Sequence, residues 1–137
     1  MMPRLRKCDE ATIAGRLRKA EQFMEGGETI REFAAGEDDI GDAYVTLCIH
    51  AGIAAADVIC CIALGEHAQG EDHSEAIAHL ASVRPDGKSL SNSLRTLLMM
   101  KSRAGYSHQQ VSATDRKRAQ RATERLLSAA HQRRISG

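Results

Sequence analysis

The sequence predicts an all-α fold, an up-and-down bundle of four main helices with one short extra helix. Apolar residues recur at helical spacing through most of the 137 residues, and no stretch alternates as a strand does. Only two prolines interrupt the chain, and aromatic residues are scarce, with no Trp, two Tyr and two Phe. The core must therefore be built from small and aliphatic side chains. We expect one domain over residues 1–137, with an ordered core at about 9–131.

The first helix is expected to begin just after Asp9, which can cap it. Apolar residues follow one another at steps of three and four over residues 13–34. This stripe keeps its phase through Gly26 and Gly27, so we predict one long helix, weakened or bent at the glycines, rather than two. Gly36 and the acidic residues after it end the helix.

The second helix, from about Asp39 to Gly65, is the centre of the predicted bundle. It contains the most apolar stretch, Ala43–Leu64, in which apolar residues cover nearly all sides. A helix of this kind belongs inside a bundle, although it could also form a homodimer interface. Small residues at 51–56 would let neighbouring helices approach closely. Asp57 is the one carboxylate in this run, and we expect it to be paired or exposed.

The remaining helices are separated by segments with turn chemistry, of which Arg84–Gly87 is the strongest break. We expect a short helix from Asp72 to Val83, with Glu75 completing a capping box. A leucine-rich helix should follow from Leu90 to about Arg103. The last helix should begin at a capping box of Ser112 and Asp115 and end at about His131, with the residues beyond it frayed.

Charge is balanced overall but unevenly placed. The net charge is +1, yet residues 25–42 hold seven acids against Arg31, and residues 115–134 hold seven bases against two acids. Two solvated helix faces, which could face each other, explain this pattern. A basic edge for phosphates is the alternative. On that alternative, Lys117, Arg121 and Arg125 form a stripe along the last helix that could follow a nucleic-acid backbone.

The four cysteines, Cys8, Cys48, Cys60 and Cys61, form no CxxC pair, and three of them lie in the apolar helix. We expect buried free thiols, which fits a reducing cytoplasm. The first residues lack the apolar core of a signal peptide, and the apolar run 51–64 is too short for a membrane span and carries a carboxylate. The sequence therefore predicts a cytoplasmic protein with no membrane contact.

A cluster of histidines and acids between residues 67 and 79 matches no standard zinc spacing, and no cysteine joins it. Two of its acids, Asp72 and Glu75, already have an explanation as a cap. We therefore expect no metal and no cofactor. The sequence also lacks a glycine-rich phosphate loop, a nucleophile elbow and an HExxH motif.

The order of these segments resembles the HEPN-type domain, a small helical bundle found beside minimal nucleotidyltransferases and in prokaryotic toxin–antitoxin and defence systems. The resemblance covers about residues 9–130. It is carried by the apolar helix with HAGIAAADVICC, by the segment GEHAQGEDHSEAIAHL, and by LLMMKSRAGYSHQQVSATDRKRAQRATERLL, in which a loop Tyr is followed by a Ser-capped helix. It implies a helical protein that works as a ribonuclease or as an RNA-associated module.

In active members of this family, metal-independent RNA cleavage depends on an Arg followed after four to six residues by a His. Arg103 and His108, in RAGYSH, have this spacing at the expected junction. Arg would hold a phosphate and His would transfer protons, with Asp57 or Tyr106 supporting them. A second such spacing ends at His131, inside the last helix. The resemblance also implies a homodimer, and the alternative is an inactive dimeric module that binds a partner protein or a nucleotide.

Overall fold

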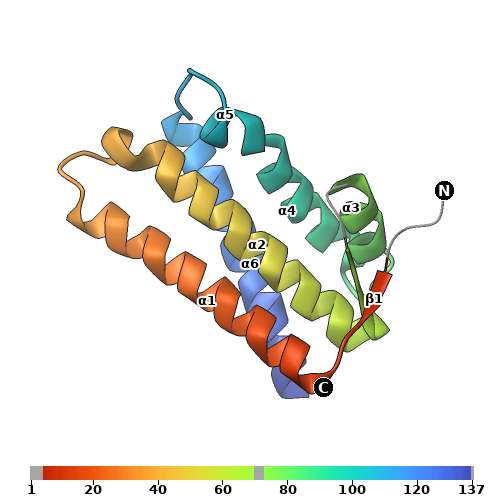
Figure 1. The fold of residues 1–137 in the computed structure, drawn as a ribbon. Helices are drawn as coiled ribbons and strands as arrows, with labels where there is room; N and C mark the ends of the chain where they lie inside the picture. The colour runs from red at the N-terminus through yellow and green to blue at the C-terminus, as the bar shows by residue number, and fades with distance from the viewer. Residues whose placement is uncertain (1–4, 70–72, 137) are drawn as a thin grey trace.

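The structure is a computed structural model that describes residues 5–69 and 73–136, and it confirms the all-α prediction. Four long helices run alternately up and down along one another (Figure 1). The elements are β1 (Leu5–Lys7), α1 (Glu10–Phe33), a 3₁₀ turn (Glu37–Ile40), α2 (Gly41–Leu64), β2 (Glu66–Ala68), α3 (His73–Ala81), α4 (Gly87–Met99), α5 (Lys101–Gly105) and α6 (Ala113–Ser136).

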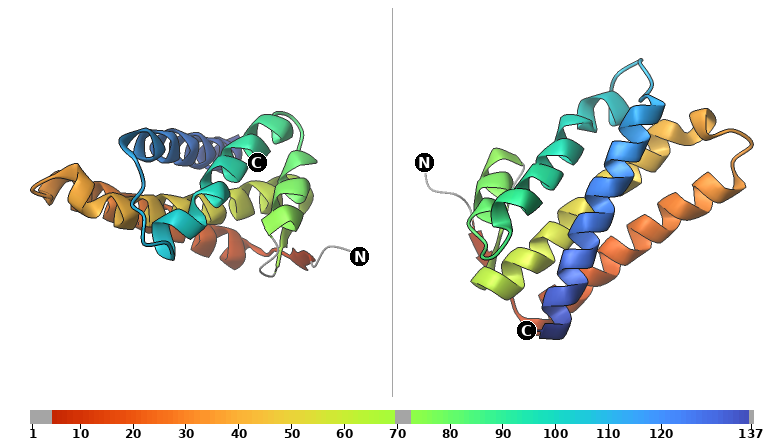
Figure 2. Two further views of the ribbon diagram at one scale, coloured as in Figure 1. Left: turned by 90° about the horizontal axis from the view of Figure 1, so that it is seen from above. Right: turned by 180° about the vertical axis from the view of Figure 1, so that it is seen from behind.

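Helix α2 lies at the centre, as predicted. It packs against α1, α6, α4 and α5, and Figure 2 shows it between α1 and α6 when the bundle is turned. Most of its side chains are buried on several sides. The stretch Glu37–Leu64 is long and apolar enough to cross a membrane by length and composition alone, and most of it is buried inside the bundle.

Helix α1 is continuous through Gly26 and Gly27, which confirms the prediction of one long helix. The Asp9 carboxylate caps it by accepting a hydrogen bond of 2.8 Å from the backbone N–H of Thr12. At Gly27 a Cβ would lie 3.5 Å from the ring of Tyr44 on α2. This distance is an ordinary van der Waals contact, so the Tyr44 ring packs closely against α1 at this position.

The ends of two later helices differ from the prediction. The leucine-rich helix is interrupted at Met100, which divides it into α4 and α5. Helix α6 does not fray after His131 but continues to Ser136. Its last turns are tied down, because Arg133 donates to the carbonyl oxygens of Arg84 and Pro85 and Arg134 pairs with Glu10.

Of the two predicted capping boxes, one is confirmed. The backbone N–H of Asp115 donates to the Ser112 hydroxyl at 3.0 Å, and the N–H of Ser112 donates to the Asp115 carboxylate at 3.2 Å. Asp72, the cap expected for α3, lies outside the described residues.

Two features at the start of the chain were not predicted. Strand β1 pairs antiparallel with β2, with Arg6 opposite His67; three residues a side are too few for a visible alternation. The prediction of four free thiols is wrong for two of them, because Cys8 and Cys61 form a disulfide. Cys48 and Cys60 are free and buried. The expectation of a cytoplasmic location rested partly on free thiols and loses that support.

Helices α2 and α4 approach each other closely at Gly52. A Cβ built on Gly52 would stand 2.3 Å from Cδ1 of Leu97 and 3.4 Å from Cδ1 of Leu126. Leu97 and Leu126 are both fully buried. The small residues predicted to let helices approach therefore do so at this glycine.

We expect Gly52→Ala to destabilise the protein by up to about 2 kcal/mol, since overpacking costs about 1–3 kcal/mol and the gain in helix propensity returns about 1 kcal/mol. Gly15→Ala is the matched control, because nothing lies within 4 Å of a Cβ there. It should stabilise by about 0.5–1 kcal/mol. Urea denaturation measures the free energy of unfolding of both variants. In a protein that also carries Leu97→Ala, Gly52→Ala should no longer be destabilising. A stabilising Gly52→Ala would contradict this packing.

Candidate functional site

The predicted catalytic pair lies at the end of the bundle where α5 meets the loop to α6 (Figure 1). Arg103 is in α5 and His108 is in the loop, and both are exposed. The turn between them is held by the carbonyl oxygen of Ser102, which accepts from the backbone N–H groups of Tyr106 and Ser107. Within the described part of the chain, neither side chain is engaged in a hydrogen bond or an ion pair. Both are free to meet a ligand, and neither lines any of the five cavities described for residues 5–69 and 73–136.

Tyr106, predicted to support the pair, is 81% exposed. With Lys101 and Gly105 it lines a cavity of about 230 Å³ against one side of α2. The α2 wall of this cavity is Thr46, Ile49, His50 and Ile53. His50 is exposed, and its ring lies against the ring of Phe23, with 5.4 Å between the two centroids.

Asp57 does not join this junction. It was expected to support Arg103 and His108, but its carboxylate faces Arg16 of α1 and His67 of β2 instead. The Asp57 side chain is 14% exposed and lines a different cavity. Ile53 of α2 lines both cavities. Asp57 lies about one helical turn after Ile53, so its side chain is near β2 rather than near the α5 junction.

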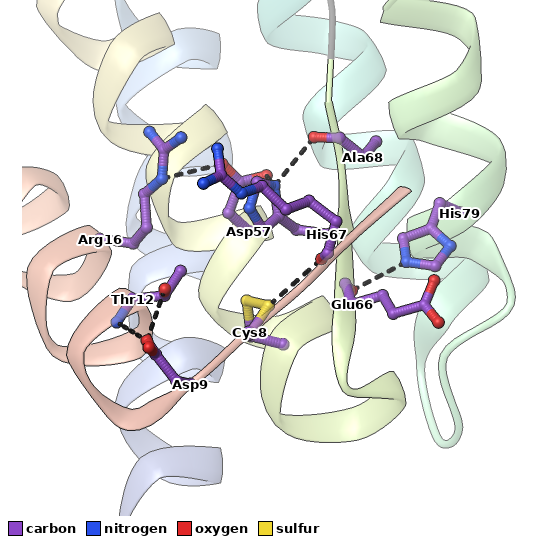
Figure 3. Close-up of a disulfide and its surroundings, with 11 residues drawn as sticks. Cys8, Asp9, Thr12, Arg16, Asp57, Glu66, His67, Ala68 and His79 are labelled. Atoms are coloured by element: carbon purple, nitrogen blue, oxygen red, sulfur yellow. Dashed lines mark hydrogen bonds and ion pairs between the residues drawn. A yellow bond between two sulfur atoms is a disulfide. The ribbon is translucent and has the colours of Figure 1, made fainter. Parts of the chain in front are cut away.

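The surroundings of Asp57 are polar (Figure 3). Its Oδ2 lies 3.5 Å from Nε of Arg16, and its Oδ1 lies 3.9 Å from Nδ1 of His67. Burial raises the pKa of the Asp57 carboxyl to about 6, while the charges of Arg16, His67 and His79 oppose that rise. Desolvation dominates because neither approach is a close ion pair.

A basic groove runs between α4 and α6. Arg118, Arg121 and Arg125 line it from α6, and Asn92, Ser93 and Thr96 line it from α4, around a volume of about 210 Å³. The Arg125 guanidinium donates to the Ser93 hydroxyl at 3.2 Å. Among the described residues that line this groove, none is acidic. We call it the arginine groove.

The packing of α6 sets this arrangement. Ala119, Ala122, Thr123 and Leu126 are buried, and the Thr123 hydroxyl donates to the carbonyl oxygen of Cys48 on α2 at 2.9 Å. With that face held against α2, the arginines beside it must turn toward α4. The predicted stripe is therefore divided: Arg121 and Arg125 lie in the groove, whereas Lys117 lines another cavity, with Arg31 and Tyr44.

The acidic and basic segments of the sequence do meet, but at a separate place. Arg116 lies 2.8 Å from Asp38 and 4.0 Å from Glu37, which join α6 to the 3₁₀ turn. This contact neutralises one base and leaves those of the arginine groove without acids opposite them. Sequence reasoning missed Arg118, although its spacing of three and seven residues from Arg121 and Arg125 was a helical signal.

No group of three or more His, Cys, Asp or Glu side chains in the described ranges is arranged to hold a metal ion. The chain matches no protein-family model, and no curated protein matches it.

The raised pKa of Asp57 makes stability depend on pH. The reference pKa of an Asp carboxyl is 3.8, and the pKa of Asp57 in the folded chain is about 6. The folded state therefore loses stability as the pH rises from about 3.8 to about 6, and above pH 6 the ionised carboxylate disfavours folding. Asp57→Asn should therefore raise the free energy of unfolding at pH 7 by on the order of 2 kcal/mol and change it little at pH 4. Urea denaturation at several pH values measures this. An Asp39→Asn control should show no such trend, and a difference that is constant with pH would contradict the prediction.

Proposed function

We propose that this protein is a HEPN-like, RNA-associated module that binds the phosphate backbone of RNA in the arginine groove. The observation that carries this proposal is the convergence of Arg118, Arg121 and Arg125 on one groove that none of the described acids lines. Guanidinium groups are the side chains best suited to phosphate, since they stay charged and donate several hydrogen bonds in a plane.

The dimensions of the groove suit a polynucleotide. Residues 118–125 cover about 10 Å of helix axis, long enough for roughly two or three successive phosphates. On the α4 side, Ser93, Thr96 and Asn92 supply hydroxyl and amide groups that can bond to sugar or phosphate oxygens. No aromatic side chain is among the described residues of the groove, which favours backbone contact over base stacking.

The loop from α5 that carries His108 leads directly into α6, the helix whose arginines line the arginine groove (Figure 1). RNA cleavage by Arg103 and His108 is the second candidate function, favoured by their exposure and by the absence of competing partners in the described part of the chain. The resemblance to HEPN-type domains implies a homodimer for this function, in which a second protomer brings its own Arg103 and His108 to the same site. An inactive module that binds a partner protein or a nucleotide is the alternative.

The binding proposal predicts a salt-dependent affinity for RNA. For a labelled single-stranded RNA, the double variant Arg121→Gln, Arg125→Gln should weaken binding roughly tenfold and reduce the slope of log K against log salt by about 1.4. Fluorescence anisotropy over a range of salt concentrations measures both quantities. Arg18→Gln removes an exposed charge from α1 and should leave affinity and slope nearly unchanged. Equal losses in the two proteins would indicate unspecific attraction rather than a groove.

The cleavage proposal predicts metal-independent activity that requires His108. With the RNA in excess EDTA, His108→Ala should slow cleavage about a hundredfold or more, because general acid–base catalysis is worth 10²–10⁴. His131→Ala is the matched control, since His131 ends the other Arg–His spacing but lies 3.7 Å from Glu21 on α1. Gel analysis of the products gives the rates. Cleavage that survives His108→Ala would exclude His108 as the acid or base and leave RNA binding as the function.

A further inference from the structure

The cavity around Asp57 lies apart from the arginine groove and shares no lining residue with it among the described residues. It has a volume of about 190 Å³ and lies between α2, β2, α3 and α4. Ile53, Leu94 and Leu98 give it an apolar wall, and Asp57, His67 and His79 give it a polar one. Arg16, with 39% of its side chain exposed, adds a charge from α1. An apolar body with one polar end is the shape of ligand that such a cavity accepts.

The Asp57 carboxylate is the acidic group that lines this cavity among the described residues, and it keeps some contact with solvent. It is largely buried, yet no hydrogen bond reaches it from any other described residue. Arg16 and His67 approach at 3.5 Å and 3.9 Å, beyond good hydrogen-bond distance. A carboxylate out of bulk water is strongly stabilised by two parallel N–H donors, one on each oxygen.

The two histidines beside it are each held by a backbone carbonyl oxygen of the β2 strand. Nδ1 of His67 lies 3.0 Å from the carbonyl oxygen of Ala68, and Nε2 of His79 lies 3.0 Å from that of Glu66 (Figure 3). A carbonyl oxygen only accepts, so each of these nitrogens carries the proton. In the neutral imidazoles the second nitrogen is then an acceptor.

The acceptors are spread out rather than gathered at one point. In the described ranges, no three side chains of metal-binding type converge on one position. A single metal ion therefore does not fit, whereas an organic cation can present N–H donors separated by several bonds. The volume suits a compact molecule, smaller than the drug-sized ligands that fill pockets of 300 Å³ or more.

From this geometry we propose that the cavity binds a small organic cation with a planar amidinium or guanidinium group. Its two N–H donors pair with the two oxygens of Asp57, and its apolar body lies against Leu94 and Leu98. Arg16 shows that a guanidinium can reach this carboxylate. Because the Arg16 side chain is partly exposed, the ligand displaces it toward solvent and takes its place.

Benzamidinium is a suitable probe, and neutral benzamide has the same shape without the charge. We expect wild-type protein to bind benzamidinium at least tenfold more tightly than benzamide in NMR titrations that follow the signals of His67 and His79. Asp57→Asn should weaken benzamidinium binding at least tenfold, and its circular dichroism and melting curve report whether it is folded. Asp39→Asn, an exposed acid on the 3₁₀ turn, should bind as the wild type does.

A second variant changes the affinity in the opposite direction. Arg16→Gln removes the competing cation and should tighten benzamidinium binding severalfold, a gain that no loss of folding can mimic. Affinity should also fall about tenfold from pH 7 to pH 5, because the pKa of Asp57 is about 6 and its carboxylate gains a proton in this range. Arg16, His67, His73 and His79 also line the cavity, Cys60 stays a thiol, and α4 contributes leucines to the wall. Equal binding of benzamide, an unchanged Asp57→Asn, or no binding by wild type and Arg16→Gln would each overturn the proposal.

Discussion

The burial of α2 is the constraint on which the rest of the structure depends. Its apolar surface on several sides can be removed from water only if α1, α6 and α4 pack around it together. Once α6 presents its buried face to α2, the neighbouring arginines are directed toward α4. Once β2 follows the end of α2, His67 is placed near Asp57. Both candidate sites are therefore consequences of how one helix is covered.

The helices could be predicted because their signals are local. The cap at Asp9, the capping box of Ser112 and Asp115, and the unbroken stripe across Gly26 and Gly27 each involve residues within a few turns of one another. The strands could not, because three paired residues leave no periodic trace. The disulfide was missed for a similar reason: nothing in the spacing of Cys8 and Cys61 indicates that β2 brings them together.

The candidate sites were predicted only in part, since a site depends on which helix faces which. Helical spacing placed Arg121 and Arg125 together, but only the packing of α4 supplied Ser93 and excluded Lys117. Asp57 was recognised as unusual from the sequence alone. Its partners came from α1 and β2 rather than from the α5 junction, because a carboxylate one turn further along α2 faces a different neighbour.

The disulfide between Cys8 and Cys61 also acts on the chain when it is unfolded. It closes a loop across 53 residues that holds all of α1 and most of α2. In the chain-entropy description, this loop closure lowers the conformational entropy of the denatured state and so stabilises the folded state by about 4 kcal/mol. Helices α1 and α2 then fold from within one closed loop. With both thiols reduced, the same pairing would have to form from a much larger set of open conformations.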